Sequence, residues 1–391
     1  MRTVFGMRFE FATAARILFG PGVRAEAAPI VADWGRRAFL LTGTTPARCD
    51  WLRLALQDAG IEVEVCATAG EPSVDTVRAA ADAARRYRAD SVIGCGGGSA
   101  LDSAKAVAGL LTNPGDPLDY LEVVGRGRSL SHPAAPWLAI PTTAGTGAEA
   151  TRNAVLGVPE RGVKASLRSP HLYARAALVD PELTLNAPAS VTAAAGMDAL
   201  TQLLEAYVCL RANPATDALC AAGLPRVARA LPTVQQNPSD LAARSDLALG
   251  ALWSGMALSG AGLGAVHGLA APIGGLWKAP HGAVCAVLLA PVMTANLAAL
   301  RRSGTRPTDG LRRYGEVAGW LTGRSDASPE EGVEWVRSRA AKGNFPRLSD
   351  YGASAAAAEE VATRALAASS MKANPASLTV QELAQIFLDA L

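Results

Sequence analysis

The first half of the chain alternates short apolar runs with longer segments that have amphipathic, helical spacing. A strand buried in a parallel sheet is a nearly continuous apolar run, whereas a covering helix is apolar about every 3.6 residues. On this basis we predict strands at residues 36–43, 61–68, 90–99 and 137–143. We predict helices at residues 74–90 and 100–111. Such alternation indicates an open, Rossmann-like parallel sheet, whose ligands bind beyond the carboxyl ends of its strands.

The pattern changes near residue 186, after which strand signals almost disappear. Ala- and Leu-rich segments with helical spacing follow at residues 191–210, 217–231, 239–264, 281–300, 310–321 and 359–369. The sequence therefore predicts an α/β dinucleotide-binding domain at residues 1–185 and an all-α domain at residues 186–391. With 391 residues, the chain is long enough for each domain to bury its own core.

One segment of the second domain is apolar enough to be considered as a membrane span. Residues 247–277 contain no Asp, Glu, Lys or Arg. The segment also holds eight glycines and Pro272, however, and no basic cluster flanks it. Helices buried on all sides in a globular core explain this composition better, so we expect no membrane partner.

Composition and charge exclude several further classes of protein. Half of the residues are hydrophobic, 18% are charged, and the net charge is +2 without any block of like charge. We therefore expect no nucleic-acid partner. The first residues do not resemble a signal peptide, and the six cysteines are scattered without CxxC pairs. Reduced thiols in a cytoplasmic protein are the expectation, and we find no basic or histidine partner that would mark a cysteine nucleophile.

The sequence GCGGGS at residues 94–99 follows a predicted strand and precedes a predicted helix. Its backbone N–H groups are unobstructed by side chains, and the helix dipole favours an anion at this place. A pyrophosphate would therefore fit the turn, although the same string also occurs in flexible linkers.

A second loop, PTTAGTGAEAT at residues 141–151, also follows a strand. The hydroxyls of Thr142, Thr143 and Thr146 could bind the ribose or carboxamide of a nucleotide. Alternatively, they cap the local turn.

Asp198 and Gln202 lie four residues apart in a predicted helix, with Ser190 as the expected N-cap, so they share one face. His267 and His281 stand in the most apolar stretch, separated by a break rich in Pro and Gly. A carboxylate and two imidazoles could hold a divalent metal ion. Three interpretations of Gln202 remain open: an altered metal ligand, a hydrogen-bond donor in a metal-free enzyme, or a buried structural amide.

Motifs along most of the chain resemble the iron-containing (group III) alcohol dehydrogenase family, which includes maleylacetate reductases. They are GGGSALDSAK, PTTAGTGAEAT, AGMDALTQLLEAY and AVHGLAAPIGGLWKAPHGAV, in that order. The resemblance implies a dehydroquinate synthase-like fold with a cleft between the domains. It implies cofactor binding by Gly97, Gly98, Ser99, Asp102, Thr142, Thr143, Thr146, Thr151 and Lys164. It places the metal positions at Asp198, Gln202, His267 and His281.

The chain departs from that family at three positions. Gln202 replaces the first metal histidine, and Ala271 replaces a second histidine that the family often carries for proton relay. Gly43 stands at the end of the first long strand, where many NAD-specific members carry an aspartate. Because Gly43 neither binds the ribose hydroxyls nor repels a 2′-phosphate, we expect the cofactor to be NADP or NAD.

We therefore predict an NAD(P)-dependent alcohol dehydrogenase or carbonyl reductase that acts on a small alcohol, aldehyde or ketone. The predicted catalytic residues are His267, His281 and Gln202, with iron or zinc as the metal ion. A metal-independent maleylacetate-type reductase, a dehydroquinate-synthase-like lyase and a non-catalytic nucleotide-binding protein are the alternatives. We expect a cytoplasmic homodimer.

Overall fold

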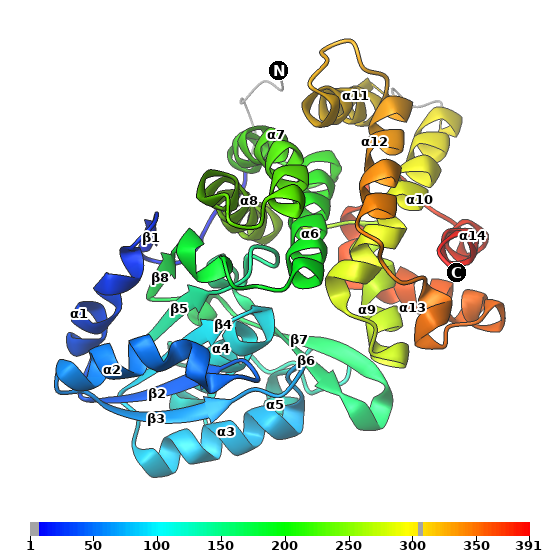
Figure 1. The fold of residues 1–391 in the computed structure, drawn as a ribbon. Coiled ribbons are helices and arrows are strands. Elements are labelled where there is room, and N and C mark those ends of the chain that lie inside the picture. The colour runs from blue at the N-terminus through cyan, green and yellow to red at the C-terminus, as the bar shows by residue number, and fades with distance from the viewer. Residues whose placement is uncertain (1–7, 304–307) are drawn as a thin grey trace.

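The N-terminal half folds around a six-stranded sheet in which every neighbouring pair of strands is parallel (Figure 1). The structure, a computed structural model, describes residues 8–303 and 308–391. The strand order is β1-β8-β5-β4-β2-β3. The strands are β1 (Ile17–Phe19), β2 (Arg37–Thr42), β3 (Glu62–Ala67), β4 (Ser91–Gly96), β5 (Trp137–Pro141) and β8 (Ala176–Val179). All four predicted strands are confirmed.

Helices cover both faces of this sheet. Leu52 and Leu56 of α2 (Asp50–Asp58) pack with α1 (Ala27–Ala32) against one face. The predicted helices α3 (Val74–Tyr87) and α4 (Gly98–Thr112) pack against the other, with the short α5 (Pro117–Tyr120) beside them. Burial on both faces explains why β4 and β5 are apolar along their whole length.

A two-stranded antiparallel hairpin, β6 (Asn153–Val158) and β7 (Val163–Arg168), projects from the sheet domain beneath the helical domain (Figure 1). The sequence analysis missed it. Its buried positions are Ala154, Leu156, Val158, Ala165 and Leu167, and the two alanines weaken the alternation of apolar and polar residues that identifies a strand.

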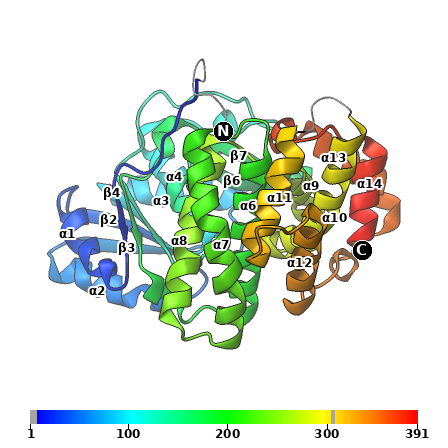
Figure 2. The ribbon, with the colours of Figure 1, turned by 90° about the horizontal axis from the view of Figure 1, so that it is seen from above.

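The C-terminal half consists of helices, all around one large apolar core, as predicted (Figure 2). They are α6 (Ala189–Val208), α7 (Pro214–Gln236), α8 (Leu241–Gly260), α9 (Ala265–Trp277), α10 (His281–Arg302), α11 (Thr308–Thr322), α12 (Pro329–Lys342), α13 (Ala358–Ala367) and α14 (Val380–Asp389). The last strand of the sheet ends at Val179 and α6 begins at Ala189, which brackets the predicted boundary at residue 186.

Two local predictions for the helical half are wrong. Ser190 does not cap α6, because the helix already begins at Ala189 behind Pro188, whose fixed backbone starts it without a side-chain cap. The segment between His267 and His281 is not a break but mostly the helix α9. Its Val266, Leu269 and Ile273 are fully buried, and this packing outweighs the poor helix propensity of its glycines and Pro272.

The apolar segment 247–277 forms parts of α8 and α9, which meet at an angle of 99°. The helix α10 is long and apolar enough to cross a membrane, but 72% of its most apolar window is buried inside the protein. Such burial is typical of core helices in a globular domain.

Candidate functional site

Three side chains from different helices meet where the helical domain faces the sheet domain. Asp198 comes from the middle of α6, and His267 and His281 come from the first turns of α9 and α10. Asp198 Oδ1 lies 3.5 Å from Nε2 of His267 and 3.5 Å from Nε2 of His281. The structure therefore brings together residues that are 83 positions apart in the sequence.

The side chain of Glu205 fixes the orientation of His267. One carboxylate oxygen, Oε2, lies 2.7 Å from His267 Nδ1, and the other accepts a hydrogen bond of 2.7 Å from the N–H of Val266. The opposite ring nitrogen, Nε2, therefore points toward Asp198. A carboxylate behind a histidine in this way fixes the ring and raises its basicity as a metal ligand. The sequence analysis missed Glu205, although its position two helical turns after Asp198 was a usable signal.

Two buried polar atoms of this cluster lack a hydrogen-bond partner in the part of the chain that the structure describes. Asp198 Oδ1 and His267 Nε2 are buried and have no hydrogen-bond partner among the described residues. Leaving polar atoms in this state is costly, and a divalent cation between them would satisfy both. The donor set of one carboxylate and two imidazoles suits iron or zinc. The residues therefore fit a catalytic metal ion.

The charges in the cluster raise the pKa of His267 and lower the pKa of Asp198. Burial lowers the pKa of His267, but the nearby carboxylates of Asp198 and Glu205 outweigh this and raise it to about 9. Burial raises the pKa of Asp198, but the two imidazole rings outweigh this and hold that pKa below its usual value. Asp198 is therefore an anion, as a metal ligand must be.

Gln202 lies one turn after Asp198 on α6 and is buried. Its carboxamide oxygen accepts a hydrogen bond of 2.7 Å from the hydroxyl of Ser254 on α8. This oxygen is the atom by which a glutamine would ligate a metal ion. That Gln202 ligates a metal ion stays a prediction, and the ion would have to share this oxygen with the hydrogen bond from Ser254.

One cysteine, Cys285, has a histidine neighbour that the sequence analysis did not identify. Cys285 lies one turn after His281 on α10, and its Sγ is 3.7 Å from His281 Nε2. The ligand atoms of Asp198, His267, His281 and Cys285 all lie within 4.8 Å of one another. The signal was the spacing of four residues between His281 and Cys285, which places two side chains on one face of a helix.

The glycine turn, Gly43 and two of the threonines come together at the carboxyl ends of β2, β4 and β5. Gly97 is the N-cap of α4, and Ser99 lies in its first turn. A Cβ built on Gly98 would lie 2.9 Å from the Thr146 side chain, and one on Gly96 would lie 3.2 Å from the backbone nitrogen of Gly43. Thr142 directly follows β5. These residues lie together at a helix N-terminus, and their role in binding a phosphate stays a prediction.

Asp102 and Thr151 are already engaged inside the protein. Lys105 on α4 is fully buried and donates to Thr151 Oγ1 at 2.8 Å, with Asp102 Oδ1 at 3.5 Å. Asp102 also accepts from the N–H of Val155. Burial raises the pKa of Asp102 and lowers that of Lys105, although each partner opposes the shift of the other. The network ties α4 to loop 141–151, and direct contact of either residue with a cofactor stays a prediction.

Lys164 lies on the hairpin at the junction of the two domains. Its Nζ is 2.5 Å from Glu71 Oε2, and its side chain is 13% exposed. A Cβ built on Gly274 of α9 would lie 2.6 Å from the same Nζ. Lys164 is therefore a cation that faces the space between hairpin and helical domain, and its predicted cofactor contact is untested.

Glu149 in the same loop gives a prediction about stability. Burial raises its pKa to about 7, against opposing effects of a backbone hydrogen bond and of Lys105. The folded protein therefore keeps a proton that the unfolded chain releases above about pH 4.5, and this stabilisation is lost as pH rises toward 7. We expect Glu149→Gln to raise the melting temperature at pH 8 relative to the unsubstituted protein, with little difference at pH 5. The exposed Glu160→Gln is the control, and an equal effect of Glu149→Gln at both pH values would contradict the prediction.

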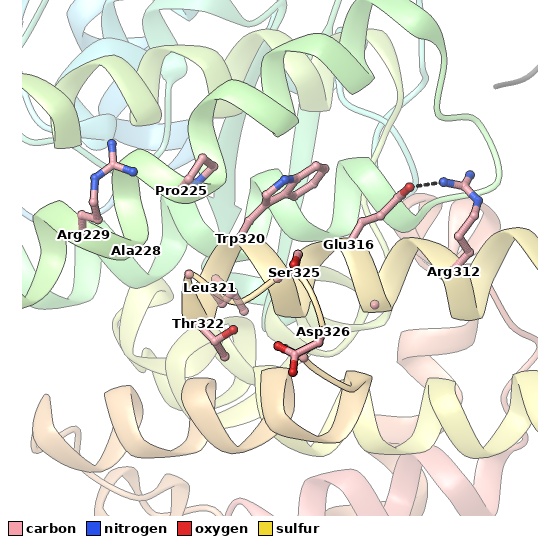
Figure 3. Close-up of a pocket in the computed structure, with 14 residues that line it drawn as sticks. Pro225, Ala228, Arg229, Arg312, Glu316, Trp320, Leu321, Thr322, Ser325 and Asp326 are labelled. Carbon is pink, nitrogen blue, oxygen red and sulfur yellow. Dashed lines mark hydrogen bonds and ion pairs between the residues drawn. The ribbon is translucent and has the colours of Figure 1, made fainter.

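A groove of about 790 Å³ lies elsewhere, between α7, α11 and the segment after α11 (Figure 3). Trp320 and Pro225 line it, and an ion pair joins Arg312 to Glu316 at its edge. Among the described residues, none of the predicted site residues contributes to it. The groove is therefore separate from the cluster on α6, α9 and α10.

Comparison with known proteins identifies the family of the chain. Residues 14–181 match the model of the family described as iron-containing alcohol dehydrogenase, and residues 192–391 match its Fe-containing C-terminal domain. The chain is 39% identical to long-chain-alcohol dehydrogenase 1 of Geobacillus thermodenitrificans, over 72% of this chain and 73% of that protein. It is 35% identical to 1,3-propanediol dehydrogenase of Klebsiella pneumoniae, over 92% of this chain and 90% of that protein.

Solved structures have the same fold. A crystal structure of 1,3-propanediol oxidoreductase aligns with a TM-score of 0.89 at 31% identity, over 98% of this chain and 100% of that one. Sulfoacetaldehyde reductase from Bifidobacterium kashiwanohense, in complex with NAD+, aligns with a TM-score of 0.83 at 25% identity, over 98% of this chain and 99% of that one. These relatives favour neither the maleylacetate-type reductase nor the lyase.

Proposed function

Starting from the fact that this chain belongs to the iron-containing alcohol dehydrogenase family and is an oxidoreductase acting on CH–OH groups, we propose its cofactor, metal site and substrate class. The chain interconverts a small alcohol and its aldehyde or ketone, with NADP or NAD as the hydride carrier. The observation that carries this proposal is the buried Asp198–His267–His281 cluster, which has unsatisfied atoms at the domain junction.

The metal ion is held by Asp198, His267 and His281. When bound, it supplies a Lewis acid that polarises the carbon–oxygen bond of the substrate. Glu205 keeps His267 in the required orientation. His281 is 36% exposed, whereas Asp198 is 2% and His267 9% exposed, so the open side of the cluster lies beside His281. The substrate approaches from that side.

The other residues of the chain position the two reactants. The glycine turn at the N-terminus of α4 anchors the pyrophosphate, and this orients the nicotinamide toward the cluster. Gln202 is fixed through its oxygen by Ser254, which leaves its amide hydrogens for the substrate oxygen. The apolar helices around the cluster exclude water, which strengthens these electrostatic interactions.

The test is a spectrophotometric assay of NAD+ and NADP+ reduction with straight-chain alcohols and diols, and of the reverse reaction with the matching aldehydes. We expect turnover that falls when a chelator removes the metal ion and returns when the metal ion is added back. Nucleotide binding without turnover across the panel would contradict the proposal and favour a non-catalytic nucleotide-binding protein. Full activity in metal-free protein would contradict the role of the metal ion.

Cofactor choice gives a second prediction. No atom lies within 4 Å of a Cβ built on Gly43, so there is space for the 2′-phosphate of NADPH and no acidic group to repel it. We expect kcat/KM with NADPH to be at least comparable to that with NADH. A preference for NADH above about 100-fold, or about 2.7 kcal/mol, would contradict this.

The substitution Gly43→Asp tests the same point in the opposite direction. A Cβ at this position meets nothing within 4 Å, and the new carboxylate would repel the 2′-phosphate. We expect kcat/KM with NADPH to fall at least about tenfold while that with NADH is kept or rises. An equal loss with both cofactors would show that the position acts through structure alone.

A further inference from the structure

The cluster that holds the metal ion contains a fourth potential ligand, the thiol of Cys285. This side chain is fully buried, and its Sγ lies 3.7 Å from His281 Nε2. Together with Asp198 and His267, the four ligand atoms lie within 4.8 Å of one another. Cys285 is therefore inside the cluster and not merely next to it.

Three separations in the cluster are close to those of a tetrahedral metal site, and all four ligand atoms lie within 4.8 Å of one another. With metal–nitrogen and metal–oxygen bonds of about 2.0–2.1 Å and a metal–sulfur bond of about 2.3 Å, tetrahedral ligands lie about 3.3–3.6 Å apart. Asp198 Oδ1 lies 3.5 Å from each histidine nitrogen, and the sulfur–nitrogen separation at His281 is 3.7 Å. Small shifts of side chains would bring all four atoms to bonding distance of one ion.

Gln202 is a weaker candidate than Cys285 for the fourth metal ligand. Its oxygen is neutral and already accepts a hydrogen bond from Ser254, whereas a thiolate is an anion and a strong ligand for zinc. Asp198 Oδ1 and His267 Nε2, by contrast, have no hydrogen-bond partner among the described residues and are free to bind. The cysteine therefore supplies a stronger fourth ligand than the glutamine.

We propose that this protein binds its metal ion through Asp198, His267, His281 and the thiolate of Cys285, with Gln202 outside the ligand set. The inference rests on the proposed function for the presence of a metal ion. The Sγ–H proton passes to solvent as the metal–sulfur bond forms. Two anionic ligands then neutralise a divalent cation, and the thiolate selects zinc over harder cations. The exposed side of His281 would leave room for substrate to approach such an ion.

Cobalt(II) is the probe, because a thiolate bound to it gives a charge-transfer band in the near ultraviolet that oxygen and nitrogen ligands do not give. We expect the purified full chain, stripped of metal, to bind one Co(II) per chain with this band. Cys285→Ser should lose the band and bind Co(II) at least about tenfold more weakly. Cys220→Ser, which alters another buried cysteine outside the cluster, should keep both the band and the affinity. Gln202→Ala should also keep the band.

X-ray absorption of the unsubstituted zinc-loaded protein gives a measurement that does not depend on the folding of any variant. We expect one sulfur in the first coordination shell. Zinc bound without sulfur, a cobalt spectrum without the charge-transfer band, or a band that persists in Cys285→Ser would overturn the proposal. The alcohol-dependent reduction of NAD(P)+ is assayed on the same samples. An active, metal-binding protein without a sulfur ligand refutes only the cysteine, whereas failure of the proposed function appears as absent turnover.

Discussion

Replacing His267 by alanine is expected to abolish dehydrogenase activity and remove the bound metal ion. His267 Nε2 faces Asp198 from a ring that Glu205 holds at 2.7 Å, so the substitution deletes one ligand and leaves two carboxylates without their shared partner. Loss of one group that stabilises transition-state charge costs on the order of 10²–10³-fold in kcat, and loss of the metal ion as well adds to this. Steady-state kinetics and metal analysis of the same sample measure both effects.

The control is His132→Ala, which removes an exposed histidine in a loop of the sheet domain. It should keep both activity and metal content. Affinity for NAD(P)H should be similar in both variants, because the glycine turn is unchanged. A His267→Ala protein that retains activity within about tenfold would contradict the assignment of the cluster as the catalytic site.

Replacing Gly97 by valine is expected to abolish nucleotide binding while the protein stays folded. A Cβ at this position would meet only the Thr143 side chain, at 3.4 Å or more, so the protein itself tolerates it. The position is the N-cap of α4, however, where the pyrophosphate must approach the backbone N–H groups closely. We expect the Kd for NADPH, measured by calorimetry, to rise at least about 100-fold, or about 2.7 kcal/mol.

The matched control is Gly315→Val, which adds the same side chain in open space on α11. Its affinity for NADPH should equal that of the unsubstituted protein. Unchanged affinity of Gly97→Val would mean that the turn only connects β4 to α4. A loss of melting temperature in Gly97→Val much larger than in Gly315→Val would contradict the expectation that the fold tolerates the change.

The spacing of apolar residues along the chain was sufficient to predict the strands and helices that are buried in a regular pattern. The middle of β2, Ala38 to Leu41, is apolar and β4 is buried throughout, because both faces of the sheet are covered. The turn GCGGGS could also be identified, because the strand β4, the glycines and the helix α4 follow one another directly in the sequence. In contrast, α9 was taken for a break, because its glycines and Pro272 have poor propensity and only packing against the core keeps the segment helical.

The site was predicted from the sequence only in part, for a related reason. The resemblance to the family placed Asp198, Gln202, His267 and His281 at the metal positions, and the structure brings the carboxylate and both histidines together. The spacing of Cys285 from His281 and of Glu205 from Asp198 places each pair on one face of a helix, but it does not give distances to other helices. Cys285 joins the cluster, and Glu205 contacts His267, because α6, α9 and α10 pack against one another.

The sequence by itself determined the two halves of this protein, the glycine turn between a strand and a helix, and the presence of a carboxylate and two histidines in apolar segments. These features depend on local periodicity and on residue types at short spacing, which a chain carries whether it is folded or not. Only the tertiary structure decided which atom each side chain faces. In the folded chain, Lys105 donates a hydrogen bond to Thr151, and Ser254 donates one to the oxygen of Gln202. Cys285 lies within the cluster of Asp198, His267 and His281. Such pairings depend on how helices pack at a few ångströms, and packing of this kind follows from the whole core and not from any one segment.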